Sequence, residues 1–287
     1  MNKNIKLAVA GAVLALSASA NAGIIIPAGD WTLDVNGNVN AFANFTKLKG
    51  DSGTINGGLA SARTSYEDTA IGINTGLLPA WLGFTGTTRQ NDVDVSFTIS
   101  MQPNVSDNGT AGDSQTNGPL WRQTFLTFGD KSWGSVKLGK DIGIFASDAI
   151  LNDMTLLGVG GAASVTSGNV TSLGGIGSGY IYAAWKGQIA YTTPNFNGFQ
   201  ATVGLTNPNQ GLALEGTANA TPALYQDRHG LEGKASYSFA GDAMSGKVWV
   251  SGASYKVKNA AGNATTFVEH TASVADLGAN VNFGGIG

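Results

Sequence analysis

The stretch from Trp31 to Thr46 reads WTLDVNGNVNAFANFT. Its odd positions are apolar or small and its even positions are polar, with Phe42 as the exception. Alternation over these 16 residues predicts a β-strand with one apolar and one polar face. Strands of soluble proteins usually have about five or six residues, so a strand of this length is unusual for a soluble protein.

The same alternation returns along the rest of the chain. Strands of about ten residues with one apolar face suit a membrane-spanning barrel, whose outside meets lipid and whose inside meets water. The apolar odd positions are Val93, Val95, Phe97, Ile99 and Met101; Trp185, Ile189 and Tyr191; Phe199, Ala201, Val203 and Leu205; and Ala275, Leu277, Ala279, Val281 and Phe283.

The connections between these runs alternate strictly between short and long. Short turns at one end and long loops at the other are typical of an outer-membrane barrel. The short ones fall at 89–92, 130–134, 195–198 and 241–246, and the long ones at 48–78, 103–119, 141–183, 207–228 and 258–271. The expected strands are 31–46, 80–88, 93–102, 121–129, 135–140, 184–194, 199–206, 229–239, 247–257 and 273–283.

Composition excludes several classes of protein. The 287 residues include 42 Gly, no Cys and two His. Without Cys there is no disulfide scaffold, Cys-bound zinc or thiol nucleophile, and two His leave little for a metal cage, so we expect no cofactor and no metal. Basic residues form no patch, so we expect no nucleic-acid partner. The mean hydropathy of +0.02 is an average over apolar and polar faces.

The first 22 residues have the features of a secretory signal peptide. Lys3 and Lys6 form a basic start, an apolar run covers 7–16, and Ala20-Asn21-Ala22 is a small-x-small cleavage site. We therefore expect residues 1–22 to be a signal peptide, and 23–287 to be one exported barrel domain.

Two other classes remain as alternatives to a channel-forming barrel. A secreted β-solenoid or adhesin is also rich in Gly and Asn, but the chain has no fixed repeat of about 20 to 50 residues. An enzymatic barrel needs a nucleophile, a base and an orienting residue. Neither His229 nor His270 has an adjacent Ser or acidic motif, so we expect no enzyme.

Four segments of the chain resemble the general, trimeric porins of Gram-negative bacteria. They are Leu82–Gly86, Arg122–Phe125 with Trp133–Lys140, Ile189–Phe199 and Asp276–Gly285. The resemblance implies an all-β, antiparallel transmembrane barrel of sixteen strands in the cell outer membrane. It also implies a homotrimer embedded in the lipid bilayer, with a water-filled channel for ions and small hydrophilic solutes.

The chain has about ten of the expected sixteen strands, and 284–287 read as a turn. We therefore expect the barrel domain to be incomplete at its C-terminus. A substrate-specific channel and a non-conducting structural or adhesive barrel stay open as alternatives.

The resemblance also places a pore constriction. In the family, the third long loop folds into the lumen; here that loop is 141–183, which contains Asp141, Asp148 and Asp153 but no Lys or Arg. Asp153 matches an acidic position of the family's constriction, whereas Thr155 stands where the family's next Glu would be.

The family places basic residues on the wall opposite this loop. Arg122 matches one of them, and its even position is expected to point into the lumen; Lys137 and Lys186 are further candidates. Trp81 and Asn38 occupy other family base positions. We therefore expect a mildly cation-selective constriction, with loop anchoring that leaves solutes unaffected as the alternative role of these charges.

Overall fold

The computed structural model describes residues 23–47, 69–74, 80–103, 120–152, 183–208, 224–225, 227–260 and 267–283. The expected signal peptide, residues 1–22, and the expected constriction residue Asp153 lie outside these ranges. Within them, no helix is long and apolar enough to cross a membrane.

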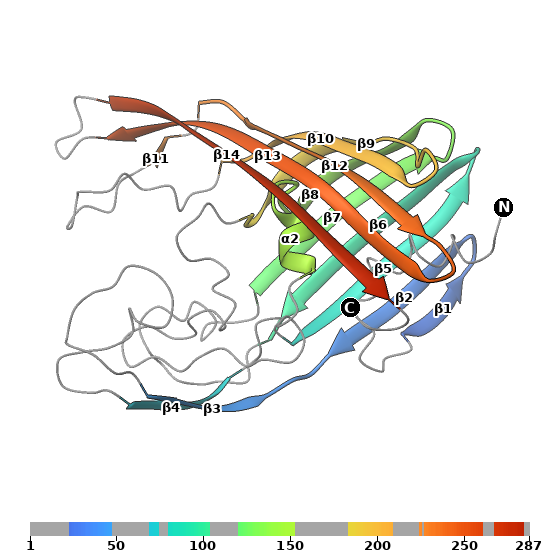
Figure 1. Cartoon of the computed structure of the whole chain (residues 1–287). Coiled ribbons are helices and arrows are strands. Elements are labelled where there is room, and N and C mark those ends of the chain that lie inside the picture. Colours follow the sequence, from blue (N-terminus) through green and yellow to red (C-terminus); the bar gives the residue numbers. More distant parts are fainter. Residues whose placement is uncertain are drawn as a thin grey trace. The chain divides into compact units, whose positions relative to one another are not determined.

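The described chain is almost entirely β-strand, as the alternation predicts (Figure 1). In hydrogen-bonding order the main sheet runs β1-β2-β5-β6-β7-β8-β9-β10-β12-β13, with β14 and β11 both paired to β13, and β3 pairs with β4 in a second sheet. Strand β1 pairs antiparallel with β2, β2 with β5 and β7 with β8, and the same holds for the consecutive pairs from β8 to β14, which confirms the expected all-β antiparallel class. The elements are β1 (Ile24–Ala28), β2 (Trp31–Asn38), β3 (Phe42–Lys47), β4 (Thr69–Asn74), β5 (Trp81–Gln90), β6 (Val93–Gln102), β7 (Leu120–Asp130), β8 (Gly134–Ile142), α2 (Ser147–Leu151), β9 (Trp185–Thr192), β10 (Phe199–Thr206), β11 (Leu224–Tyr225), β12 (Gly230–Ala240), β13 (Met244–Ala260) and β14 (Phe267–Phe283).

Three features differ from the expected strands. The single strand expected over 31–46 is two strands, and the second begins at Phe42, the residue that breaks the alternation. β4 and β11 form inside stretches expected to be long loops, and β1 precedes the first expected strand. β4 forms because it pairs with β3, and backbone pairing of this kind leaves no signal in the side-chain pattern.

Tight turns join neighbouring strands. Asn91 and Asp92, between β5 and β6, both have positive φ (49° and 62°), as a two-residue type I′ turn requires. Between β9 and β10, the Asn195 Oδ1 atom accepts a hydrogen bond from the Gly198 backbone N–H at 2.7 Å. Gly198 has φ of 103°, a conformation in which Gly has no steric penalty.

The described residues group into two compact units, the first of which holds β1 to β4 and Trp81–Thr87 of β5. β2 pairs with β1 on one side and with β5 on the other. On the polar face of this unit, the Trp81 indole N–H donates to Asn36 Oδ1 at 3.3 Å. Trp81 and Asn38, which replace the expected family bases, are direct partners across β5 and β2.

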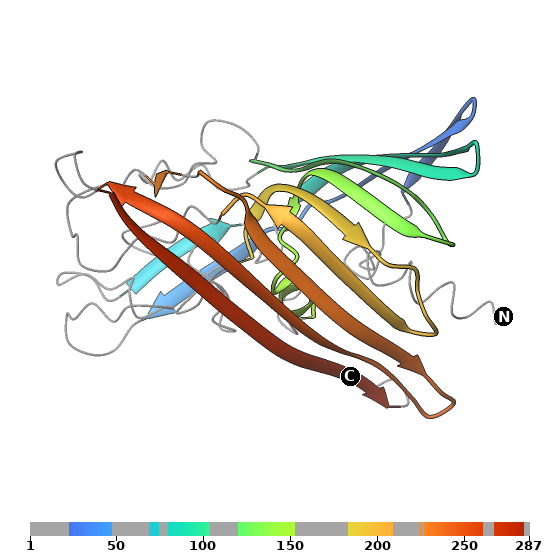
Figure 2. The ribbon, with the colours of Figure 1, turned by 90° about the horizontal axis from the view of Figure 1, so that it is seen from above.

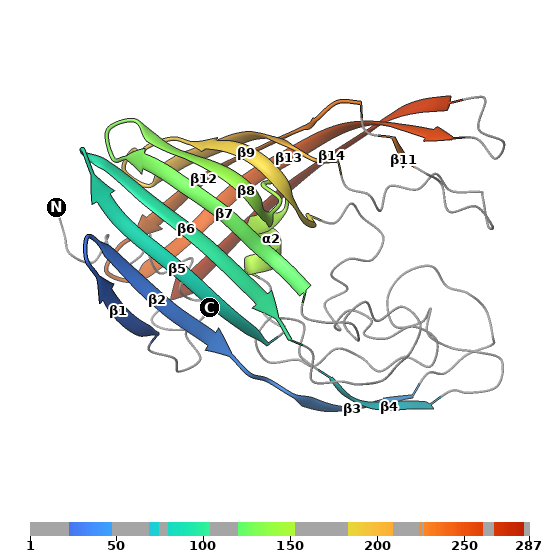
Figure 3. The same cartoon turned by 180° about the vertical axis from the view of Figure 1, so that it is seen from behind.

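The second unit contains β8 to β14, the segment 143–149 and the parts of β5, β6 and β7 next to their turns. In Figure 2, β12, β13 and β14 run side by side as long antiparallel strands. Seen from behind in Figure 3, the chain passes from β8 into the short helix α2.

The sheet of this second unit has two chemically different faces. One face, which we name the loop face, carries Lys186, Gln188, Glu232, Lys234 and Ser251, and the segment 143–149 lies on it. The other face, which we name the apolar face, carries side chains between 47% and 56% exposed, namely Ile189, Val203, Leu205, Leu231 and Val250. A broad exposed apolar surface of this kind is unfavourable in water and suits contact with lipid.

Candidate functional site

The segment that follows β8 leaves the strand through Gly143. The Gly143 N–H donates to the carbonyl of Ala184 at 2.8 Å, and a Cβ at this position would clash with the backbone carbonyl oxygen of Ala183. Ala146 then takes a positive φ of 58°. The close approach excludes larger residues from position 143, so the chain can turn onto the loop face only with Gly there.

A single carboxylate, that of Glu232, binds both this segment and the sheet. Its Oε2 atom accepts a hydrogen bond from the Phe145 backbone N–H at 2.9 Å. Its Oε1 atom accepts hydrogen bonds from the Tyr255 hydroxyl at 2.6 Å and the Thr206 hydroxyl at 3.0 Å. Lys186 forms an ion pair with the same oxygen. The Glu232 side chain has no solvent exposure, and these partners satisfy a buried charge that would otherwise be very costly.

The next residue of the segment is bonded to a neighbouring strand. The Ala146 N–H donates to Ser251 Oγ at 3.0 Å, and the Ser251 hydroxyl donates to Asp276 on β14. Ser147 in turn donates its hydroxyl to the carbonyl of Ile144 at 2.9 Å, which closes the turn. Consecutive residues of the segment are therefore bonded to β12 and β13.

Asp148 lies between two lysines of the sheet. Lys247 is ion-paired with its Oδ1 atom, and Lys234 lies 3.1 Å from its Oδ2 atom while donating to Ser147 Oγ at 2.9 Å. The side chains of Lys234 and Lys247 are 25% and 22% exposed, against 7% for Asp148. Burial alone raises the pKa of the Asp148 carboxyl, but the attraction of both ammonium groups outweighs it and holds that pKa below its ordinary value.

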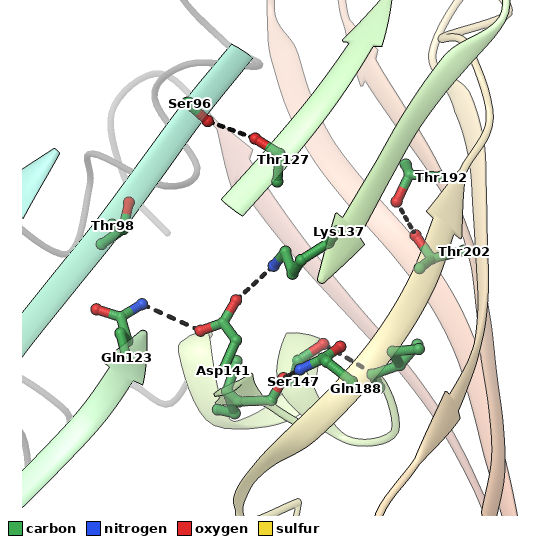
Figure 4. A network of polar contacts seen from close by, with 12 residues as sticks. Ser96, Thr98, Gln123, Thr127, Lys137, Asp141, Ser147, Gln188, Thr192 and Thr202 are labelled. Atoms are coloured by element: carbon green, nitrogen blue, oxygen red, sulfur yellow. Dashed lines mark hydrogen bonds and ion pairs between the residues drawn. The ribbon is translucent and has the colours of Figure 1, made fainter. Parts of the chain in front are cut away.

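A second acid–base group lies where β8 ends. Asp141 accepts a hydrogen bond from the Gln123 side-chain amide at 3.1 Å and forms an ion pair with Lys137 (Figure 4). The Lys137 ammonium also lies 4.6 Å from the centre of the Phe125 ring. Asp141 is buried and Lys137 is half-buried, so this pair is partly shielded from water.

The structure brings the predicted residues together only in part. Asp148 and Lys186 both lie on the loop face, but each has its own partners, and Asp141 pairs with Lys137 four residues earlier. Lys186 is buried against Glu232 rather than exposed to solvent. Asp153 lies outside the described residues.

Gln123, the neighbour of Arg122 on β7, faces the end of β8. Phe125 pairs with Gly139 across β7 and β8, and Gln123 reaches Asp141, so the odd positions of β7 share a face with the odd positions of β8. The place of Arg122 in the constriction stays a prediction.

Sequence reasoning missed the residues that hold the segment most closely: Ser251, Glu232, Lys234, Lys247 and Tyr255. Glu232 and Lys234 stand at alternate positions of a strand whose other face carries Leu231 and Tyr237, both exposed. Glu232 and Lys234 are opposite charges on the polar face of a strand expected to span the membrane. This pattern could have identified the site from the sequence. Within the described ranges, no group of three or more His, Asp or Glu side chains could hold a metal ion.

Comparisons with known proteins give one family and a set of solved structures. A sequence profile described as Gram-negative porin matches residues 7–287. Among solved structures, an anion-selective porin from Comamonas acidovorans is 15% identical with a TM-score of 0.48, and the match covers 87% of this chain and 74% of that one. Salmonella typhi OmpF in complex with daunomycin is 14% identical with a TM-score of 0.35, and the match covers 89% and 87%. No curated protein matches the sequence.

Proposed function

The chain belongs to the Gram-negative porin family, and we propose that it forms a water-filled channel through which ions and small hydrophilic solutes diffuse passively. Porins of this family are channels of the outer membrane rather than enzymes. The observation that carries the proposal is the two-faced sheet: the apolar face suits lipid, while the loop face holds the segment 143–149 through ion pairs. The segment is held against the polar wall by its backbone N–H groups and by Ser147 and Asp148, and a loop held there narrows the channel.

The charged constriction of this channel is assigned to Asp148 with Lys234 and Lys247, and to Asp141 with Lys137. The two lysines beside Asp148 are about one quarter exposed, so their ammonium groups are available to a passing ion. Charges a few ångströms from a passing ion contribute about 1 kcal/mol in a water-like environment and more where water is partly excluded. This magnitude is enough to bias which ions pass.

We propose a mild preference for cations at this constriction, because the loop 141–183 holds acids and no bases. The described charges beside the segment 143–149 do not oppose this preference. Asp141, Asp148 and Asp276 are three acids against the three lysines Lys137, Lys234 and Lys247, so the lysines leave no positive excess. Acids of the loop then favour the entry of cations over anions.

Single-channel recording in planar lipid bilayers tests the function directly. Large steps that added solutes do not block support a general diffusion channel. Currents that one class of sugar or phosphate blocks would instead indicate a substrate-specific channel, and an absence of steps a structural or adhesive barrel. The reversal potential in a KCl gradient measures the ion preference, and an anion preference would contradict the proposal.

Assembly and export are part of the same proposal. A homotrimer is proposed from family membership, and cross-linking in detergent with mass determination of the complex tests it. Removal of residues 1–22 on export follows from the signal-peptide pattern. N-terminal sequencing of the protein recovered from outer membranes would detect cleavage after Ala22.

A further inference from the structure

We propose that Glu232 is a positioning residue that fixes the path of the segment 143–148 and thereby sets the conductance of the channel. The inference rests on the proposed channel function and assigns a role within it to a residue that does not itself contact solutes. Its side chain has no solvent exposure, so any effect on permeation must act through the residues it holds.

The two oxygens of the Glu232 carboxylate have different partners. Oε1 binds the sheet, through Lys186 on β9, Thr206 on β10 and Tyr255 on β13. Oε2 binds the segment, through the backbone N–H of Phe145. The carboxylate therefore links β9, β10 and β13 to one main-chain N–H of the loop. Its contacts with these strands set its orientation independently of the loop.

The sheet side of this arrangement is rigid. Lys186 donates to the Tyr255 hydroxyl at 3.0 Å, so the lysine, the tyrosine and the carboxylate form a closed triangle of contacts. Lys186 and Tyr255 are both buried. Because hydrogen bonds to charged groups are stronger than neutral ones, Glu232 holds Phe145 with less freedom than a neutral acceptor would.

The position of Phe145 determines what the next residues can reach. Phe145 lies two residues before Ser147, which accepts from Lys234, and three before Asp148, which pairs with Lys234 and Lys247. Those lysine contacts are partly exposed and are weakened by water and salt, whereas the Glu232 contact is dry. The buried contact between Glu232 and Phe145 therefore fixes the backbone of the segment. The partly exposed contacts of Asp148 with the two lysines place charges where passing ions meet them.

The experiment compares hydrogen exchange of the Phe145 amide with channel conductance in the same refolded protein. Glu232→Gln is the first variant. Because it leaves Lys186 without its counter-charge and can prevent folding, Lys186→Met/Glu232→Gln is the second. The control is Thr202→Val, which removes the Thr192–Thr202 hydroxyl pair on the same face of β10 and leaves the partners of Glu232 in place. Hydrogen bonds to charged acceptors predict that amide exchange becomes about tenfold to a hundredfold faster in the Glu232 variants.

We expect the Glu232 variants to combine faster Phe145 exchange with altered conductance and greater current noise, and Thr202→Val to retain wild-type values. Unchanged exchange or unchanged conductance in folded Glu232 variants overturns the inference, as does an equal change in Thr202→Val. If the wild-type protein forms no channel, the proposed function fails, and the exchange measurement still reports whether Glu232 holds the segment.

Discussion

Lys186 on β9 and Glu232 on β12 form an ion pair whose side chains are 5% and 0% exposed. Removing one partner of a buried pair leaves the other charge uncompensated, which usually costs about 3 to 5 kcal/mol. We therefore expect Lys186→Met to lower the free energy of unfolding by this amount. Urea unfolding in detergent micelles or lipid vesicles measures it.

The matched control for this pair is Lys186→Met/Glu232→Gln, which removes both charges. Replacing a buried pair as a whole is often close to neutral for stability, so the double variant should recover most of the loss. If Lys186→Met is as stable as the wild type, the ion pair with Lys186 is not needed to keep the Glu232 charge buried, and the prediction is wrong.

The second prediction concerns the pH dependence of the segment's attachment. The two lysines beside Asp148 hold the pKa of its carboxyl below the ordinary aspartate value of about 3.9. A group whose pKa is lowered by folding contributes stability that is fully present above its unfolded pKa and is lost as the pH falls through its folded pKa. Conductance and current noise should therefore stay constant from about pH 7 to about pH 4.5 and change only in stronger acid.

Asp148→Asn is the control for this acid transition, because it has no carboxyl to protonate. In this variant the acid change should disappear, and the noise near pH 7 should resemble that of the wild type in strong acid. A wild-type transition between about pH 5 and pH 6 that is absent from Asp148→Asn would contradict the lowered pKa.

Ion preference provides the third prediction. Lys234→Gln/Lys247→Gln removes the two partly exposed positive charges beside Asp148, and should shift the reversal potential in a KCl gradient toward cations. Asp148→Asn should shift it toward anions. A unit charge at about 4 Å contributes about 1 kcal/mol in water, so the permeability ratio should change about fivefold for each charge removed. Shifts of the same sign in the two variants would show that these charges do not act on permeating ions.

The alternation of the sequence predicted the strands, but it could not predict by itself which positions face the loop. Paired residues share a face, so the number of residues in each turn decides whether the parity changes. Thr127 pairs with Lys137, which keeps odd positions on the loop face from β7 to β8. Lys234 pairs with Ser251, which changes the loop face from even positions in β12 to odd positions in β13. One parity rule therefore does not apply to every strand of the chain.

The candidate site was predictable to a smaller extent than the fold. The acids Asp141 and Asp148 were found because the family resemblance points to their loop. The partners of Asp148, Lys234 and Lys247, lie 86 or more positions further along the chain. Pairing at that distance depends on strand register and on the turn at Gly143, neither of which a single sequence encodes locally.

The turn between β5 and β6 allows a test of backbone strain. Asp92 has a φ of 62°, and its side chain is fully exposed, with only a long contact of 3.9 Å to Arg89. A Cβ costs about 1 to 2 kcal/mol in this left-handed conformation, and Gly is free of that cost. Asp92→Gly should therefore raise the free energy of unfolding by about 1 kcal/mol, and Asp92→Ala, which keeps the Cβ, should not. Equal stabilities of the two variants would exclude turn strain as the cause.

The two faces of β10 allow the membrane orientation to be tested with neighbouring residues. Val203 lies near the middle of β10, is 51% exposed and belongs to the apolar face. Thr202 points the other way, with its hydroxyl 3.0 Å from that of Thr192. A Lys on the lipid side near the bilayer midplane costs about 2 to 4 kcal/mol, so Val203→Lys should lower the unfolding free energy in lipid vesicles by about that amount.

Thr202→Lys is the matched control, because it adds the same side chain one residue away on the face assigned to water. It should cost much less stability than Val203→Lys and should instead shift the reversal potential toward anions, since it adds a positive charge to the channel wall. The comparison is made on the same strand, so differences in strand pairing or folding efficiency cancel. If Thr202→Lys were the more destabilising of the two, the lipid-facing and water-facing sides of the sheet would have to be exchanged, and the assignment of the loop face to the channel interior would fail with them.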